Sequence, residues 1–421
     1  AARTGVYTVG NSNRGPAALR QLSGARNATT LAPDVVTLAE SLRDAGYRCV
    51  HAGKWHLGDD PCTQGFQVNI GGDTRGHPRR QFADQTGGGW EYPHLPPNGV
   101  AGEWLDDRLT RDALSHLATI RDQPFFLSLC FYGVHTPIHA PEEDQAPFLR
   151  KAPGSRHAHA TYAGYIKSVD DNVGRVLQFL ETTDDPRAPG KELLAINIVC
   201  LTTDYGGVGG FRGLIFVLAD ITTQAPVSGC MGTLREGGIR VPLIVRWDSR
   251  LPAGRVEQTP VQLLDLYPTF CEAAKVAPKQ ELDGVSLLAL ANTGVPLQRD
   301  TLFWHFPAYL QGGKRPDGTY SWRTTPVSVI RRGPLKLLHY YEDARWELYD
   351  LEHDLGERQN LVDELPAEVG ELATALHEWL SETKAAMPLG ESGQPLTPPS
   401  ATPKSRDDAP LSPASLPRPR P

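Results

Sequence analysis

The chain has 421 residues, of which 40% are hydrophobic and 22% charged, so it can bury a large core and should divide into about two domains. The formal net charge is −7 and no block of lysine or arginine occurs, which argues against nucleic-acid binding. Six widely spaced cysteines without a Cys-x-x-Cys pair support neither a zinc site nor a dense disulfide framework.

Three times along the chain, a run with helical periodicity leads into an apolar run typical of a buried strand. The three pairs are 35–45 with 47–50, 104–120 with 125–132, and 162–180 with 194–201. This repetition predicts an α/β fold with a mainly parallel sheet sandwiched by helices. A strand over 242–247 and a helix over 261–274 continue the same region.

The sequence changes character at about residue 301. Short β-rich runs at 302–305, 327–330 and 335–339 predict a smaller antiparallel α+β subdomain, which ends in a helix over 367–380. Ten prolines follow between residues 388 and 421, and this tail has too little apolar surface to order itself. We therefore expect a catalytic-type domain over 1–290, a C-terminal subdomain over 291–386 and a proline-rich disordered tail over 387–421.

No stretch reaches the roughly 18 to 20 consecutive apolar residues of a membrane helix, so no membrane span is expected. The N-terminus also lacks a basic-then-apolar signal. Because Ala1 is not methionine, we interpret the sequence as a processed or truncated product.

In doubly wound sheets ligands bind beyond the carboxyl ends of the strands, so the loops that leave the predicted strands are the first places to look for chemistry. Lys54 and His56 follow the strand at 47–50 and are bracketed by Gly53 and Gly58. In an extended backbone residues two apart point to the same side, so this pair predicts an anion site. The alternative is a solvated turn in which Trp55 packs locally.

Two further strand-end loops carry His135 and Asp204. His135 lies in a loop that contains two prolines, and Asp204 precedes a pair of glycines. Taken singly, His135 could instead be a hydrogen-bonded structural histidine, and Asp204 could instead cap a helix or a turn. Together the three loops predict a pocket for a tetrahedral oxyanion beside a hard divalent cation, Ca²⁺ or Mg²⁺, because such ions take carboxylate oxygen.

Five segments, in chain order, resemble motifs of the sulfatase family. They are His51 to Gly58 (the second family signature), residues 133–141 (the P-H-x-P loop, with Val134 in place of the first proline), Asp204 to Gly207 (D-N-G-G), residues 232–242 (G-x-x-x-E-G-G-x-R-V-P) and residues 348–361 (Y-D-L-x-x-D-P-x-E-x-x-N-L). The resemblance runs from residue 1 to about residue 380 and leaves the tail outside.

The resemblance implies an alkaline-phosphatase-like fold and an enzyme that hydrolyses sulfate esters of an aryl or carbohydrate substrate. In this family a cysteine in Cys-x-Pro-Ser-Arg is oxidised to formylglycine, whose hydrate attacks sulfur while a divalent cation, usually Ca²⁺, polarises the sulfate. Carried over, Lys54 and His56 would hold the formylglycine hydrate, His135 would contact the sulfate or the leaving oxygen, and Asp204 would bind the metal. The family also implies a periplasmic, lysosomal or secreted protein.

The sequence departs from the family pattern in three ways. Its first five residues look like those that follow Cys-x-Pro-Ser-Arg, so we expect the nucleophile, its arginine and the earlier metal aspartates to be missing. Tyr205 replaces an Asn or His beside the metal, and Met231 replaces a second sulfate-binding lysine; one such contact is worth about 2.7 to 4 kcal/mol. We therefore expect no sulfatase turnover from the chain alone, even with Ca²⁺.

Three hypotheses follow. The first is a sulfatase whose gene product continues upstream of Ala1. The second is a sulfatase-fold protein without catalysis that keeps a groove for sulfate, glycan or a partner. The third, ranked lowest because the Lys-x-His and Glu-Gly-Gly segments resemble sulfatases specifically, is a metal-dependent phosphoester hydrolase of the same superfamily.

Overall fold

The computed structural model describes residues 4, 6–7, 16–96, 98–152, 154, 157–209, 221–310, 313–314 and 320–399. The chain folds into two compact units, each assembled from separate stretches: Ala1–Ala28, Asp204–Val241 and Asp300–Pro421 form one, and Thr29–Thr203 with Pro242–Arg299 form the other. Residues 204–241 thus group with the C-terminal residues, which a single boundary at residue 290 does not express. The functional division into a catalytic domain and a subdomain stays a prediction.

A three-stranded parallel sheet in the order β2-β1-β3 organises the second of these units, called here the α/β unit. Its strands are β1 (Arg48–Gly53), β2 (Val68–Ile70) and β3 (Phe125–Cys130). Gly53 at the end of β1 lies opposite Cys130 at the end of β3. Because the strands are parallel, the loops that leave β1 and β3 begin side by side at one edge of the sheet.

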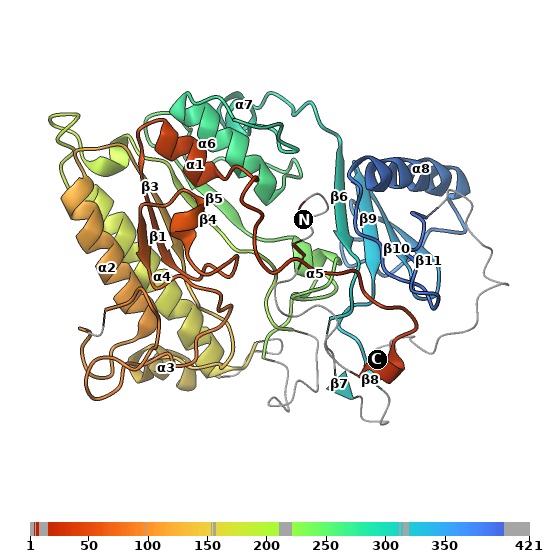
Figure 1. Ribbon diagram of the computed structural model, residues 1–421, viewed down its shortest axis with the longest axis horizontal. Helices are drawn as coiled ribbons and strands as arrows, with labels where there is room; N and C mark the ends of the chain where they lie inside the picture. Colours follow the sequence, from red (N-terminus) through yellow and green to blue (C-terminus); the bar gives the residue numbers. More distant parts are fainter. Residues whose placement is uncertain are drawn as a thin grey trace. The chain divides into compact units, whose positions relative to one another are not determined.

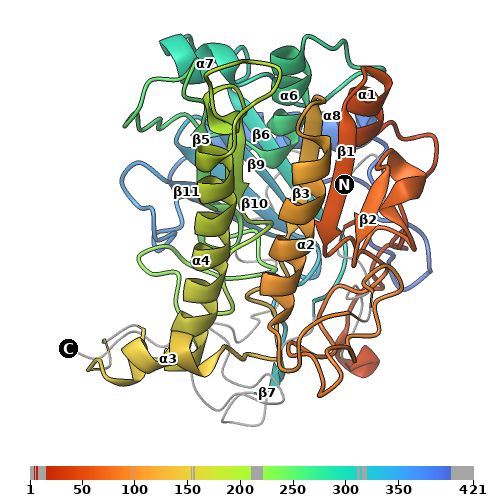
Figure 2. The same ribbon diagram turned by 90° about the vertical axis from the view of Figure 1, so that its left-hand side faces the viewer.

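Helices cover both faces of this sheet. The unit contains α1 (Leu38–Asp44), α2 (Leu105–Ile120), α3 (Glu142–Leu149), α4 (Ala160–Thr182), α6 (Leu266–Ala274) and α7 (Leu288–Thr293). Val50 packs with Leu109 of α2, and its neighbour Cys49, which points the other way, packs with Leu42 of α1. Figure 2 shows α2 and α4 running alongside one another. The predicted parallel sheet between helices is confirmed.

The strand predicted over 194–201 begins later than expected. β4 (Val199–Thr202) pairs antiparallel with β5 (Leu243–Arg246) in a separate two-stranded sheet. Leu193 and Leu194 lie before it in a short 3-10 turn and pack against Leu180 of α4. The prediction began the strand at Leu194 because an apolar run alone does not distinguish a turn packed on a helix from a strand.

The other unit is built on an antiparallel sheet of four strands in the order β11-β10-β9-β6, as predicted for the C-terminal region. These strands are β6 (Thr301–Phe306), β9 (Val327–Arg332), β10 (Leu335–Tyr340) and β11 (Arg345–Asp350). α8 (Pro366–Glu382) lies across one face, where Leu376 packs against Ile330 and Leu337 (Figure 1). The short α5 (Glu236–Ile239) and the two-residue strands β7 (Gly313–Lys314) and β8 (Tyr320–Ser321) complete the unit.

The beginning of the segment predicted to be a disordered tail makes ordered contacts. Met387 is buried, and Leu389 exchanges backbone hydrogen bonds of 2.9 and 2.6 Å with Ser23. The average composition of the tail hides these few apolar residues at its start. Residues 400–421 lie outside the described residues, as do most of residues 1–5. No helix within the described ranges is both long and apolar enough to cross a membrane.

Candidate functional site

The first site residue, Lys54, directly follows β1, beside the end of β3. Its backbone N–H donates to the carbonyl oxygen of Cys130 at 2.8 Å. The preceding Gly53 has φ +93°, and a Cβ there would lie 2.0 Å from the same carbonyl oxygen. Only glycine allows this approach, so the loops that follow β1 and β3 start from one place.

His56 is held by the segment 73–77 rather than by an extended strand. Its φ of 59° is in the left-handed region, so the predicted extended backbone through Lys54 and His56 is wrong. The His56 N–H donates to the carbonyl of Asp73 at 2.9 Å, and a Cβ on Gly76 would lie 2.2 Å from the imidazole Cε1. The tight turn, not strand alternation, keeps the imidazole beside the ammonium group.

The electrostatic environment keeps His56 neutral. Burial, followed by the positive charge of Lys54, lowers the pKa of His56 to about 4, and the imidazoles of His135 and His77 act in the same direction. The four basic side chains are therefore near neighbours. At neutral pH the His56 imidazole offers one hydrogen-bond donor and one acceptor beside a cation.

His135 comes from the loop that follows β3. Its backbone N–H donates to Tyr132 at 2.9 Å, and its Nδ1 donates to the carbonyl of Thr136 at 2.7 Å, which fixes the ring tautomer. The ring of His77 stacks on His135 with centroids 5.9 Å apart and an interplanar angle of 26°. His77 was not predicted as a site residue, because only the flanking Gly76 and Pro78 mark its loop in the sequence.

Asp106, in the first turn of α2, holds the start of the His135 loop. It is 1% exposed, and its carboxylate accepts a hydrogen bond of 3.2 Å from the backbone N–H of Tyr132. A Cβ on Gly133 would lie 2.7 Å from Oδ2, so the loop packs directly against the carboxylate. Burial raises the pKa of Asp106 to about 7, against the lowering effect of these backbone donors.

The turn 54–58 was predicted either to form an anion site or to pack locally through Trp55. These two descriptions apply to different sides of the same turn. Trp55 packs edge-on against His51 and Phe66, with ring centroids 5.3 and 5.9 Å away. His51 is 1% exposed, and burial lowers its pKa to about 4. The apolar side of the turn anchors it in the core, while Lys54 and His56 lie with the other imidazoles.

Asp204 is the first residue of the stretch 204–241, which belongs to the unit with the antiparallel sheet. The following Gly206 donates to Gly238 at 3.1 Å, and a Cβ at this position would lie 1.8 Å from the Gly237 carbonyl oxygen. Burial and the Asp204 charge raise the pKa of Tyr205, so its phenol stays neutral. Across the described ranges, no group of three or more His, Cys, Asp or Glu side chains is placed to hold a metal ion.

Two family models match the chain. One, described as "Sulfatase", matches residues 7–188, and the other, "N-sulphoglucosamine sulphohydrolase, C-terminal", matches residues 233–386. A sulfatase of Formosa agariphila is 30% identical over 419 residues, which cover 87% of this chain and 73% of that protein. The chain belongs to the sulfatase family.

Other sulfatases match over shorter parts of their length. The N-acetylgalactosamine-6-sulfatase of Canis lupus familiaris is 28% identical over 68% of this chain, which spans only 53% of that relative. The structure of Ps i-CgsB in complex with k-i-k-neocarrahexaose superposes with a TM-score of 0.66 at 23% identity, over 86% of this chain and 78% of the other. BT4656 in complex with its substrate D-glucosamine-2-N,6-O-disulfate gives 0.63 at 20% identity, over 91% and 92%. The predicted alkaline-phosphatase-like fold is confirmed.

Two of the sulfatase motifs are joined by a buried ion network. Lys336 of β10 is fully buried, and its Nζ lies 2.9 Å from a carboxylate oxygen of Glu236 and 2.9 Å from one of Glu357. Glu357 also accepts a 2.9 Å hydrogen bond from the backbone N–H of Glu236. Glu236 of the Glu-Gly-Gly segment and Glu357 of the C-terminal motif therefore stabilise one unit. Both carboxylates are paired with the ammonium group of Lys336.

Proposed function

We propose that this chain is part of an enzyme that hydrolyses sulfate esters of carbohydrates. The observation that carries the proposal is the gathering of Lys54, His56 and His135 beyond the carboxyl ends of two adjacent parallel strands. A cation beside imidazoles at such an edge suits a tetrahedral oxyanion. Family membership makes sulfate the oxyanion of choice, and the whole protein's activity is part of the proposal.

Each of the three residues has a distinct role in this proposal. Lys54 supplies the positive charge that binds a sulfate oxygen. The pKa of His56 is lowered to about 4, so its imidazole is neutral at neutral pH. It can donate a hydrogen bond to the attacking group or accept one from it, and it adds no positive charge to the site. His135, whose Nδ1 is committed to Thr136, acts at the leaving oxygen through its other ring nitrogen.

The substrate class is proposed from the relatives. The names of similar proteins include N-acetylgalactosamine-6-sulfatase, and one similar structure holds D-glucosamine-2-N,6-O-disulfate. These names favour a sulfated sugar over a simple aryl sulfate. By family resemblance we place the protein in the periplasm, in the lysosome or outside the cell.

Calcium and formylglycine are proposed only because other members of the family use them. Asp204 is proposed as one carboxylate ligand, but Ca²⁺ takes about 6 to 8 oxygen ligands, and the buried phenol of Tyr205 is a poor one. The described donor set does not fit a complete cation site. None of the six cysteines of this sequence precedes x-Pro-Ser-Arg, so formylglycine is assigned to none of them.

A second candidate, sulfate binding without catalysis, is favoured by Met231. This residue stands where the family has a sulfate-binding lysine, and its backbone N–H donates to Gly207 at 3.1 Å beside the Asp204 loop. A thioether there gives neither charge nor a strong donor.

The deciding experiment measures sulfate release from N-acetylgalactosamine 6-sulfate and binding of the same sugar by calorimetry. Both the 421-residue chain and the product of its complete reading frame are tested, with the 6-phosphate sugar as a comparison. The variant is His135→Ala, and the matched control is His139→Ala, an exposed histidine of the same loop.

Sulfate release that exceeds phosphate release and is lost only in the His135 variant supports the enzyme. Tight sulfate binding without turnover from either protein supports the second candidate. Absence of both binding and turnover contradicts the two proposals together, and faster phosphate release would favour the phosphoester hydrolase.

A further inference from the structure

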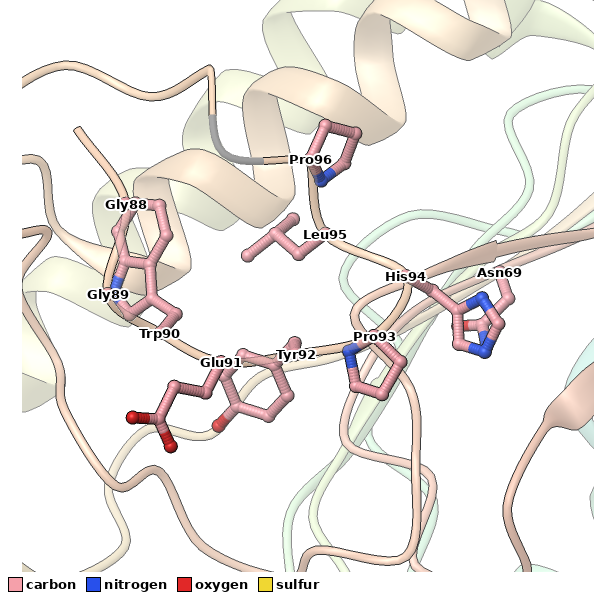
Figure 3. A pocket seen from close by; sticks show the side chains of 10 residues that line it. All are labelled: Asn69, Gly88, Gly89, Trp90, Glu91, Tyr92, Pro93, His94, Leu95 and Pro96. Carbon is pink, nitrogen blue, oxygen red and sulfur yellow. The ribbon is translucent and has the colours of Figure 1, made fainter. Parts of the chain in front are cut away.

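A recess of about 530 Å³ opens in the α/β unit beside the segment that holds His56. It is lined by ten residues: Asn69, Gly88, Gly89, Trp90, Glu91, Tyr92, Pro93, His94, Leu95 and Pro96. Figure 3 shows nine of them on one loop that curves around the recess, with Asn69 contributed by β2. The volume lies in the range of small-ligand sites, roughly 300 to 1,000 Å³.

Two arginines behind the loop hold the recess in shape. Arg108 of α2 is fully buried, donates to the carbonyl of Pro96 at 3.0 Å and lies 5.8 Å from the ring centroid of Trp90. Arg75 lies 4.2 Å over the ring of Tyr92 and donates to the carbonyl of Glu91 at 2.5 Å. A lining fixed in this way is pre-organised, which reduces the entropy lost on binding.

The same arginine connects the recess to the imidazoles. Arg75 Nε donates to Asp73 at 2.6 Å, and the carbonyl of Asp73 accepts the His56 N–H. Two residues further along this segment, His77 stacks on His135. Segment 73–77 therefore contacts the pocket loop through Arg75 and the candidate site through Gly76 and His77, so the two places are neighbours in one unit.

The lining favours an uncharged, hydroxyl-rich ligand. None of its ten residues is lysine or arginine, and Arg79, which lies beside the lining, is already paired with Glu91 at 2.7 Å. The lining residues themselves therefore supply no cation to a sulfate or carboxylate group. The exposed Glu91 and His94 offer side-chain hydrogen-bonding groups, and Asp60, which lies 3.9 Å from His94, adds a carboxylate. The Asn69 amide is already used within the protein, because it donates to Asp60 and to the Gly72 carbonyl at 2.9 Å each. The remaining exposed surface comes mainly from Pro93 and Pro96, because Trp90 and Tyr92 are only 2% and 5% exposed. Proline rings can contact the apolar face of a sugar ring.

We propose that this recess binds an uncharged sugar ring of a glycan whose sulfated ring occupies the place formed by Lys54, His56 and His135. The inference rests on the proposed function for the sulfated ring, but the recess has its own chemistry and its own test. It assigns to the loop 88–96 a role in choosing the sugar next to the sulfate ester.

The test compares dissociation constants of the full chain for four probes, measured by calorimetry. The probes are N-acetylglucosamine 6-sulfate, the same sugar with galactose joined to it (6-sulfo-N-acetyllactosamine), unsulfated N-acetyllactosamine, and a disaccharide in which a glucuronate replaces the galactose. The pocket variant combines Glu91→Gln with His94→Ala; both side chains are exposed, so the fold should survive. His139→Ala is again the control.

We expect the sulfated disaccharide with the uncharged galactose to bind about tenfold more tightly than the sulfated monosaccharide, and the glucuronate disaccharide to gain little. In the pocket variant the tenfold ratio should fall close to one, with the monosaccharide affinity unchanged. If the disaccharide gains nothing, or keeps its gain in the pocket variant, the recess proposal is overturned while sulfate recognition stands. Variant-sensitive binding of the unsulfated disaccharide without sulfate binding would support the recess and overturn the proposed function; no binding at all overturns both.

Discussion

Asp106 allows a sharp test of how the His135 loop is held, because its carboxylate is buried and its pKa is shifted far from the ordinary range. The pKa of Asp106 rises from 3.8 to about 7 in the folded protein, mainly through burial. At about 1.4 kcal/mol for each pKa unit, a charged Asp106 lowers the free energy of unfolding by roughly 4 kcal/mol relative to the protonated form. The folded-state pKa is raised, so the stability is fully present below about pH 4 and is lost as pH rises through about 7.

The perturbation is Asp106→Asn, which keeps the shape but removes the titration. Urea unfolding of both proteins is measured between pH 4.5 and pH 8, and the difference in unfolding free energy is plotted against pH. We expect the wild-type protein to lose about 3 kcal/mol relative to the variant over this range, because part of the full loss already occurs below pH 4.5. The amide also presents a donor to the loop N–H groups, which adds a loss of about 1 to 3 kcal/mol to the variant at every pH.

The control is Asp107→Asn, one residue along α2. The Asp107 side chain is 45% exposed and accepts a 2.7 Å hydrogen bond from the Asn172 amide. Removing this exposed carboxylate should therefore give no comparable pH dependence of the unfolding free energy. The buried phenols of Tyr92 and Tyr165, which feel the Asp106 charge, do not titrate in this window because burial raises their pKa values. A flat difference between wild type and Asp106→Asn would refute the argument that a buried carboxylate clamps the loop.

Three further predictions concern other contacts. Lys336→Met should lower the free energy of unfolding by about 3 to 5 kcal/mol, measured by urea titration, because two buried carboxylates lose their shared cation; a loss under 1 kcal/mol contradicts the network. Gly53→Ala should cost about 1 to 3 kcal/mol more than Gly46→Ala, since both glycines have positive φ but only the first meets a carbonyl oxygen; equal losses contradict the close approach. Lys54→Met should raise the pKa of His56 from about 4, followed by NMR titration of the imidazole, and an unchanged value would mean that burial alone sets it.

The elements that the sequence predicted best are the long periodic ones. α2 and α4 follow their apolar spacing because each buries one stripe against the sheet or a neighbouring helix. The start of β4 was misplaced, since Leu193 and Leu194 are buried by a helix rather than by strand pairing. Apolar content predicts burial, and the type of element then depends on partners that are distant in sequence.

The candidate site was predicted in part for a similar reason. Lys54 and His135 directly follow strands, where parallel-sheet geometry says polar residues gather. His77 follows β2, a strand of only three residues that the sequence pattern did not predict, and the packing of its loop on His56 brings it to the same place. Asp106 resembles the acidic residues common in the first turn of any helix, so the sequence gives no sign that it is buried.

Only some of the residues that reveal the family would also perform its chemistry. Glu236 and Glu357, the acidic residues of two motifs that carry the resemblance, are paired with Lys336 inside one unit, where they stabilise the fold and cannot also bind a ligand. A sulfatase-fold protein that lost catalysis would still need this network, since its loss would lower the stability of the unit. Family membership therefore does not decide between an enzyme and a sulfate-binding protein. That decision depends on Lys54, His56 and His135, whose side chains are not needed for such a network, and binding and turnover measured on variants of these residues will make it.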